Sequence, residues 1–105
     1  LTKHGFGVYS TEAPKGDYKH ENLQAEVDAC PTRKWLVDHD GDVTIESYTV
    51  MFSDDEPAVG HFACLTPNGE RTWANSSDPD VLQDMQVTEY CGRAARVDGA
   101  GNLTL

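Results

Sequence analysis

The chain has 105 residues, and its 18 acidic and 8 basic side chains give a formal net charge of −10. This length allows one hydrophobic core and excludes a second complete domain or a deep active site with walls of its own. Hydrophobic residues make up 38% of the chain and charged residues 25%, which is typical of chains that fold. The acidic surplus argues against a general nucleic-acid binder, because such proteins bind phosphates through Lys and Arg.

No apolar run approaches the roughly 20 residues needed to cross a bilayer, and residues 1–6 lack the apolar stretch of a signal peptide. We therefore expect a cytoplasmic protein. The chain has no initiator Met, and we interpret it as a piece of a longer polypeptide.

Three widely spaced cysteines fit neither a disulfide framework nor the paired spacing of a zinc site. Cys30, Cys64 and Cys91 are therefore expected to be reduced thiols. Cys64 and Cys91 should be partly buried in or beside strands.

The first predicted elements are a strand over residues 1–10 and a short helix over residues 20–29. A polar break containing Pro and Gly at residues 12–17 separates them. Leu23 and Val27 lie four residues apart, and Pro31 follows the predicted helix. Because this apolar stripe is narrow, we expect the helix to lie on a surface rather than to form a core.

The clearest strand covers residues 43–52, after a turn at residues 38–42. Val43 and Ile45 mark one face, whereas Tyr48, Val50 and Phe52 have the opposite parity. A change of phase within one strand indicates a β-bulge, here near residues 46–47.

Further strands are predicted at residues 59–65 and 71–75, joined to one another and to the preceding strand by short turns. A helix should run from Pro79 to about Met85, with Ser77 or Asp78 as its cap. A last strand pair, residues 93–97 and 103–105, flanks a Gly-containing turn. This pattern predicts an all-β fold, a small antiparallel Greek-key barrel of the OB type with one or two short helices.

Candidate ligand residues do not form a recognisable site. Asp38, Asp40 and Asp42 resemble the start of a calcium loop, but residue 43 is not Gly and residue 49 is not Glu. Four histidines are scattered without the spacing of metal ligands: His4, His20, His39 and His61. We therefore predict no metal-binding residue and an ordinary hairpin turn at residues 38–42.

Motifs for nucleophilic catalysis or phosphate binding are also absent from the sequence, so we predict no catalytic and no cofactor-binding residue. The Gly5-Phe6-Gly7 pair is too short to cradle a phosphate. The glycosylation patterns at residues 75–77 and 102–104 are interpreted as turn residues. Four aromatic residues form either a ligand-stacking face or, as we expect, part of the core: Tyr48, Phe52, Phe62 and Trp73.

Four segments together resemble the C-terminal end of actinobacterial thiolase-like proteins labelled acetyl-CoA acetyltransferases, which belong to acyl-CoA and lipid metabolism. These segments are residues 1–12, 24–28, 46–51 and 71–75. In that family a thiolase fold is followed by an additional C-terminal β-barrel. The resemblance implies that residues 1–12 are the end of the thiolase-fold domain with its linker, and that residues 17–105 are the accessory domain.

The resemblance also implies that thiolase chemistry, with any CoA thioester, belongs to the parent chain and not to these residues. The first hypothesis is an accessory or interaction domain that packs on the thiolase-like body of the same polypeptide or on a partner subunit. The alternative is an independent OB-type module for an oligonucleotide or an oligosaccharide, although the acidic charge disfavours nucleic acid. An enzyme complete in these residues is the third hypothesis, and it needs a convergent polar pocket that the sequence does not indicate.

Overall fold

The computed structural model describes residues 5–105 and divides them into two compact units, one ending at Pro31 and the other spanning Thr32–Leu105. The first unit contains a single short helix, α1 (Gln24–Asp28), whose residues are all exposed. The helix expected over residues 20–29 is therefore present but shorter, and the side chain of Asn22 accepts a hydrogen bond from the N–H of Gln24 at its start. Residues 5–10 form no strand, and the first four residues of that predicted strand lie outside the described part.

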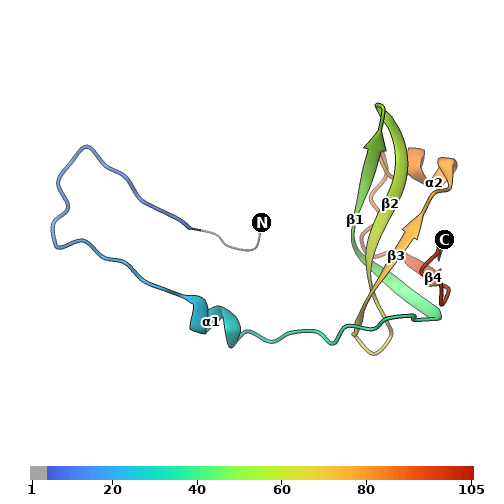
Figure 1. Ribbon diagram of the computed structural model, residues 1–105, viewed down its shortest axis with the longest axis horizontal. Coiled ribbons are helices and arrows are strands. Elements are labelled where there is room, and N and C mark those ends of the chain that lie inside the picture. The colour runs from blue at the N-terminus through green and yellow to red at the C-terminus, as the bar shows by residue number, and fades with distance from the viewer. Residues whose placement is uncertain (1–4) are drawn as a thin grey trace. The chain divides into compact units, whose positions relative to one another are not determined.

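The second unit contains five strands and one helix (Figure 1). The strands form one antiparallel sheet in the order β3-β2-β1-β4-β5. Three consecutive strands followed by a fourth that returns beside the first is the Greek-key order. The elements are β1 (Gly41–Ser53), β2 (Glu56–Leu65), β3 (Arg71–Ser76), α2 (Pro79–Asp84), β4 (Ala94–Val97) and β5 (Leu103–Thr104). None of the helices in residues 5–105 is long and apolar enough to cross a membrane.

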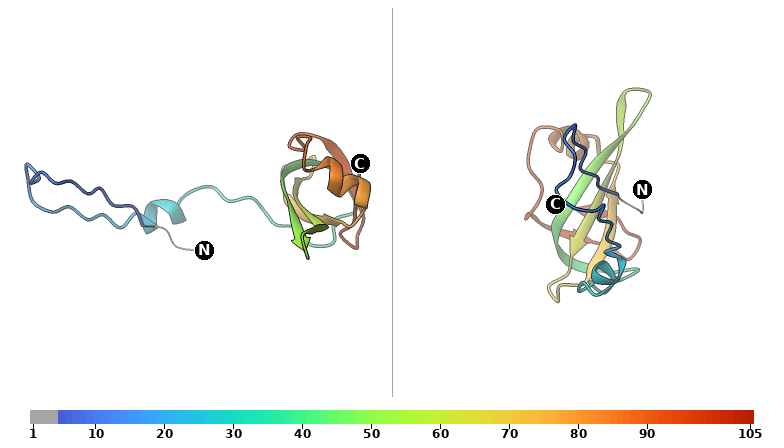
Figure 2. Two further views of the ribbon diagram at one scale, coloured as in Figure 1. Left: turned by 90° about the horizontal axis from the view of Figure 1, so that it is seen from above. Right: turned by 90° about the vertical axis from the view of Figure 1, so that its left-hand side faces the viewer.

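The bulge predicted in β1 is confirmed. The register between β1 and β2 passes from Ile45 opposite Cys64 to Ser47 opposite Ala63, which leaves one extra residue in β1. Before the bulge Ile45 faces the core, and after it Tyr48 does, so the change of parity keeps apolar side chains on the same face. The strand bends at this point, and the sheet curls instead of lying flat (Figure 2).

The sheet is curled but is not closed into a barrel. Its two edge strands, β3 and β5, share one isolated parallel bridge, in which the N–H of Asn75 donates to the carbonyl of Gly101 at 2.8 Å. Strand β5 has only two residues, too few to form a ladder with β3. The all-β antiparallel fold is thus confirmed, whereas closure is limited to this bridge.

Residues 34–36 run along the edge of β3 instead of forming one arm of a hairpin. The N–H of Arg71 donates to the carbonyl of Lys34, and the N–H of Leu36 donates to the carbonyl of Arg71, both at 2.8 Å. The hairpin turn predicted at residues 38–42 is therefore wrong. This stretch crosses from the β3 edge to the start of β1, because the free backbone groups of the edge strand capture the incoming chain.

The core lies between the inner face of the sheet and α2. Phe62 is fully buried at its centre, and Tyr90 enters from the loop after α2 with its ring 6.3 Å from that of Phe62. Leu82 of α2 and Met85, which follows the helix, belong to the same buried cluster and cover it from the helical side. The helix begins as predicted, because the carboxylate of Asp78 accepts a hydrogen bond from the N–H of Asp80.

Gly60 on β2 lies against Met85, the residue that follows α2. A Cβ at this position would meet the Sδ atom of Met85 at 2.9 Å and its Cε atom at 3.0 Å. We expect Gly60→Ala to lower the free energy of unfolding by about 1–3 kcal/mol, because the buried Met85 must be displaced. Urea denaturation followed by circular dichroism measures this loss. Gly16→Ala, which meets nothing within 4 Å, is the matched control, and equal stability of both variants would contradict the packing argument.

Asp84 organises the loop between α2 and β4. It accepts hydrogen bonds from the hydroxyls of Thr88, at 2.6 Å, and Tyr90, at 2.9 Å, and lies 3.5 Å from the guanidinium of Arg93. These donors, with Thr88 first, hold the pKa of the Asp84 carboxyl below its usual value. The loop that carries Tyr90 into the core is therefore fastened by an ionised side chain.

The lowered pKa of Asp84 sets the sign of a pH effect. The Asp84 carboxyl takes up a proton at higher pH in the unfolded state than in the folded state. The stabilisation that ionised Asp84 gives the folded protein is therefore fully present above about pH 4, and it is lost as the pH falls through the pKa of the folded state. We expect Asp84→Asn to be less stable than the parent at about pH 7 and to approach it below about pH 3. Urea midpoints across this range measure the difference. Asp55→Asn, at the β1–β2 turn, is the control, and a difference for Asp84→Asn that does not change with pH would contradict the assignment.

Candidate functional site

A cleft of about 220 Å³ lies where the sheet fails to close. It is bounded by the β3 edge, the crossing segment and the loop before β5. Its lining residues are 35–39, Thr72, Trp73, Asn75 and 98–101. We call it the tryptophan cleft, because both tryptophans of the chain contribute to its walls.

Backbone hydrogen bonds position these walls. Trp73 points to the outer face of β3 because its neighbours Thr72 and Ala74 are buried on the inner face. Trp35 is placed by its bridge to Arg71. The cleft is therefore built from main-chain geometry at an unpaired sheet edge.

Another part of the wall is a tight turn held by hydrogen bonds to Asp98. One carboxylate oxygen of Asp98 accepts from the N–H of Ala100 at 3.0 Å and from the N–H of Asn102 at 2.8 Å. The second oxygen accepts from the side-chain amide of Asn102. These bonds, led by the one from the Asn102 side chain, hold the pKa of Asp98 below its usual value. Gly101 supplies the positive φ of 83° that the turn requires.

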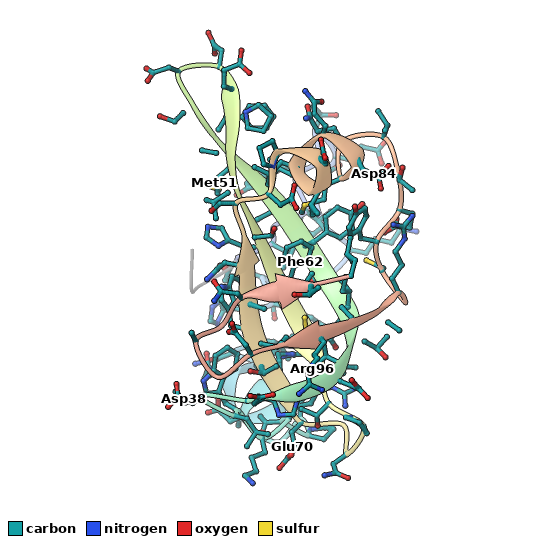
Figure 3. The ribbon with its side chains drawn as sticks, turned by 90° about the vertical axis from the view of Figure 1, so that its right-hand side faces the viewer. Asp38, Met51, Phe62, Glu70, Asp84 and Arg96 are labelled. Carbon is teal, nitrogen blue, oxygen red and sulfur yellow. The ribbon has the colours of Figure 1, made fainter. Side chains whose placement is uncertain are left out.

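The cleft is aromatic and acidic. Trp35 is 51% exposed and Trp73 45%, so both indoles are open to solvent. Asp38 lies at the end of the sheet opposite the β1–β2 turn (Figure 3), and its carboxylate makes no hydrogen bond or ion pair within residues 5–105. Among the described residues that line the cleft there is no Lys or Arg.

His39 lines the cleft, and His61 contacts two of the other lining residues, Trp73 and Asn75. The Nε2 atom of His39 is buried and has no hydrogen-bond partner in the described part of the chain, a situation that costs about 1–3 kcal/mol. His61 on β2 lies with its ring 5.9 Å from that of Trp73, and its Nδ1 is 2.6 Å from the side-chain oxygen of Asn75. His61 therefore supports one wall, whereas His39 carries unused hydrogen-bonding capacity.

The other residues considered as ligands from the sequence do not come together in one site. Arg96 pairs with Asp40 at 2.7 Å and with Asp42 at 3.5 Å, so those two carboxylates face a cation, away from a common ligand. His20 is exposed in the first unit, and His4 lies outside the described residues. Across residues 5–105, no three His, Cys, Asp or Glu side chains are grouped as a metal site requires.

The aromatic residues divide between core and surface. Phe62 is buried and Tyr48 packs against the core, as expected, but Trp73 and the 54% exposed Phe52 do not join it. Sequence reasoning missed Trp35 and His39 as parts of a cleft. A usable signal for Trp73 was its alternation with Thr72 and Ala74, whereas nothing local marked Trp35.

The three cysteines lie in different surroundings. Cys64 is fully buried, and burial raises the pKa of its thiol to about 11. Cys91 is exposed, contrary to the expectation of partial burial, and a hydrogen bond to Glu89 raises the pKa of its thiol. Cys30 is also exposed. Raised pKa values leave Cys64 and Cys91 poor nucleophiles near neutral pH.

Residues 22–102 match the family model described as the thiolase-like protein type 1 additional C-terminal domain, and the chain belongs to this family. Among solved structures it resembles a monomeric SCP2-thiolase-like protein type 1 from Mycobacterium smegmatis, with 30% sequence identity and a TM-score of 0.68. The match covers 79% of this chain and 19% of that protein, so the chain spans about a fifth of the relative's length. No match was found among the curated proteins.

The reactivity of the three thiols tests the burial of Cys64 and the exposure of Cys30 and Cys91. At about pH 8 roughly 0.1% of a thiol with a pKa near 11 is ionised, and burial also blocks access to it. With a disulfide reagent we expect Cys30 and Cys91 to react in the folded protein, and Cys64 to react only in denaturant. Mass spectrometry of the labelled peptides assigns each site. The variant Cys64→Ala should lose only the denaturant-dependent reaction, and prompt labelling of Cys64 would contradict its burial.

Proposed function

We propose that this domain is a non-catalytic accessory domain that associates with the thiolase-like body of its parent protein. The observation that carries the proposal is family membership, since the family is defined as an additional domain of a thiolase-like protein. In the related Mycobacterium smegmatis protein, the matched region is 19% of the chain. Most of such a protein therefore lies outside the domain.

The proposal assigns thiolase chemistry and CoA thioester binding to the parent chain. In support, the tryptophan cleft has about 220 Å³, below the roughly 300–1,000 Å³ of pockets that hold cofactor-sized ligands, and the larger hollow of about 530 Å³ beside Ala95 and Arg96 is a shallow depression open to solvent. The buried thiol of Cys64, with its raised pKa, is poorly suited to attack an acyl group. An acetyl-CoA acetyltransferase role, if the parent has one, would be carried by the rest of the chain.

We also propose that the curled antiparallel sheet is an OB-type barrel. Three features support it: the β1-β2-β3 meander, the helix between β3 and β4, and the return of β4 beside β1. OB folds are five-stranded, partly open Greek-key barrels. The single bridge between Asn75 and Asn102 fits such partial closure.

The alternative remains an independent OB-type ligand binder. Trp73 and His61 favour it, because both lie on the outer face of the sheet with their rings 5.9 Å apart. Stacking on such residues is how many OB folds hold single strands. The net charge of −10 opposes this function for an oligonucleotide but not for an oligosaccharide. Family membership makes association with a protein the better supported function.

Calorimetry tests the proposal. The 105-residue chain is titrated into the separately produced thiolase-like body of the same parent, and we expect saturable binding with a dissociation constant in the micromolar range, about −8 kcal/mol. The affinity of the body for CoA is measured with and without the domain. A titration into bovine serum albumin controls for nonspecific association.

Two results would overturn the proposed function. One is the failure of the domain both to bind the body and to alter its affinity for CoA. The other is salt-dependent binding of single-stranded DNA of about 12 nucleotides at physiological ionic strength, which would favour the alternative.

A further inference from the structure

The tryptophan cleft is sized for a side chain. Its volume of about 220 Å³ corresponds to roughly seven waters at about 30 Å³ each. A flexible aliphatic chain with a polar head fits this space better than a nucleotide does. The occupant is therefore sought among the side chains of a protein partner.

The charges around the cleft favour a cation. Asp38 and Asp98 both line it, and the described lining residues include no Lys or Arg to neutralise them. The hydrogen bonds of Asp98 are directed into its own turn. Asp38 has no such partner in residues 5–105 and remains the open acceptor.

The aromatic walls favour a flat cation. The half-exposed indoles of Trp35 and Trp73 offer ring faces to which cations are attracted. Guanidinium groups stack on such faces and carry five N–H donors in a planar fork, whereas an ammonium group is compact and strongly hydrated.

We propose that the tryptophan cleft binds an arginine side chain presented by the protein partner of this domain. The partner follows from the proposed function and is the thiolase-like body. Asp38 accepts the guanidinium N–H groups, and Trp35 and Trp73 contact its faces. The cleft is thus an anchor point of the interface, and the exposed remainder of the sheet surface surrounds it.

The two tryptophans make the cleft directly observable, because the sequence contains no others. Two indole N–H signals in a ¹H–¹⁵N NMR spectrum therefore report on its two aromatic walls. The probe is N-acetyl-arginine amide, and N-acetyl-citrulline amide is the neutral control of the same shape. We expect both indole signals to shift saturably with arginine, with a dissociation constant on the order of 10 mM, and citrulline to bind at least about tenfold more weakly.

Three variants locate the interaction. Asp38 has a positive φ of 58°, which Asn tolerates well, so Asp38→Asn removes the charge without straining the backbone. We expect Asp38→Asn and Trp73→Leu each to weaken arginine binding by at least about fivefold. Met51→Leu, a half-exposed position on β1 outside the cleft, should bind like the parent. Circular dichroism confirms that each variant is folded. Equal binding of arginine and citrulline, or unchanged binding by Asp38→Asn, would overturn the proposal.

The interface experiment separates this inference from the proposed function. If the body binds the parent domain and Asp38→Asn equally well, the arginine contact is wrong while the accessory function stands. If the thiolase-like body does not bind the domain but N-acetyl-arginine amide does bind it, the accessory function is wrong and the cleft still recognises a basic side chain. We expect the body to bind, with at least about fivefold weaker binding by Asp38→Asn.

Discussion

The bulge in β1 is the constraint on which the rest of the unit Thr32–Leu105 depends. Before it, β1 pairs with β4 on one side and β2 on the other, and after it β1 continues only with β2. At the bulge the N–H of Ile45 donates to the carbonyl of Arg93, and its carbonyl accepts from the N–H of Gly92. The segment that precedes β4 therefore leaves the sheet at this point, and Tyr90, two residues before Gly92, is directed into the core. A bulge increases local twist, so one extra residue couples the curl of the sheet to the packing of its core.

Much of this fold can be predicted from the sequence because its signals are local. Alternation of apolar residues locates the strands, and a change of parity after Ile45 locates the bulge. Asp78 followed by Pro79 marks the helix start through capping chemistry. The strands and the helix of the unit Thr32–Leu105 agree with these predictions within a few residues. Positive φ values at Asp54 and Asp55 show a turn whose type was not apparent, because Asp tolerates this conformation without requiring it.

The tryptophan cleft could not be predicted in the same way, because its walls are far apart in sequence. Trp35, Trp73 and the turn at residues 98–101 meet only because β5 is too short to pair with β3. The length of an edge strand depends on where its hydrogen bonding to the neighbouring strand stops. The alternation of apolar and polar residues does not encode that point. A hairpin turn was predicted at residues 38–42, since nothing local indicates that residues 34–36 pair with β3. The sequence motifs therefore described the core well and the open edge poorly.

The same open edge explains why binding capacity is expected here and not on the paired face of the sheet. Main-chain bonds at 2.8 Å hold residues 34–36 to Arg71, and the side chain of Arg71 forms a two-pronged pair with Glu46, at 2.7 and 2.9 Å. Because that pair is partly exposed, solvent screens it in part, and the backbone bonds contribute to the positioning as well. The walls of the cleft are thus set by rigid main chain while its aromatic and acidic side chains stay open to solvent. A preorganised surface of this kind loses little conformational entropy on binding, which suits a domain whose proposed role is association.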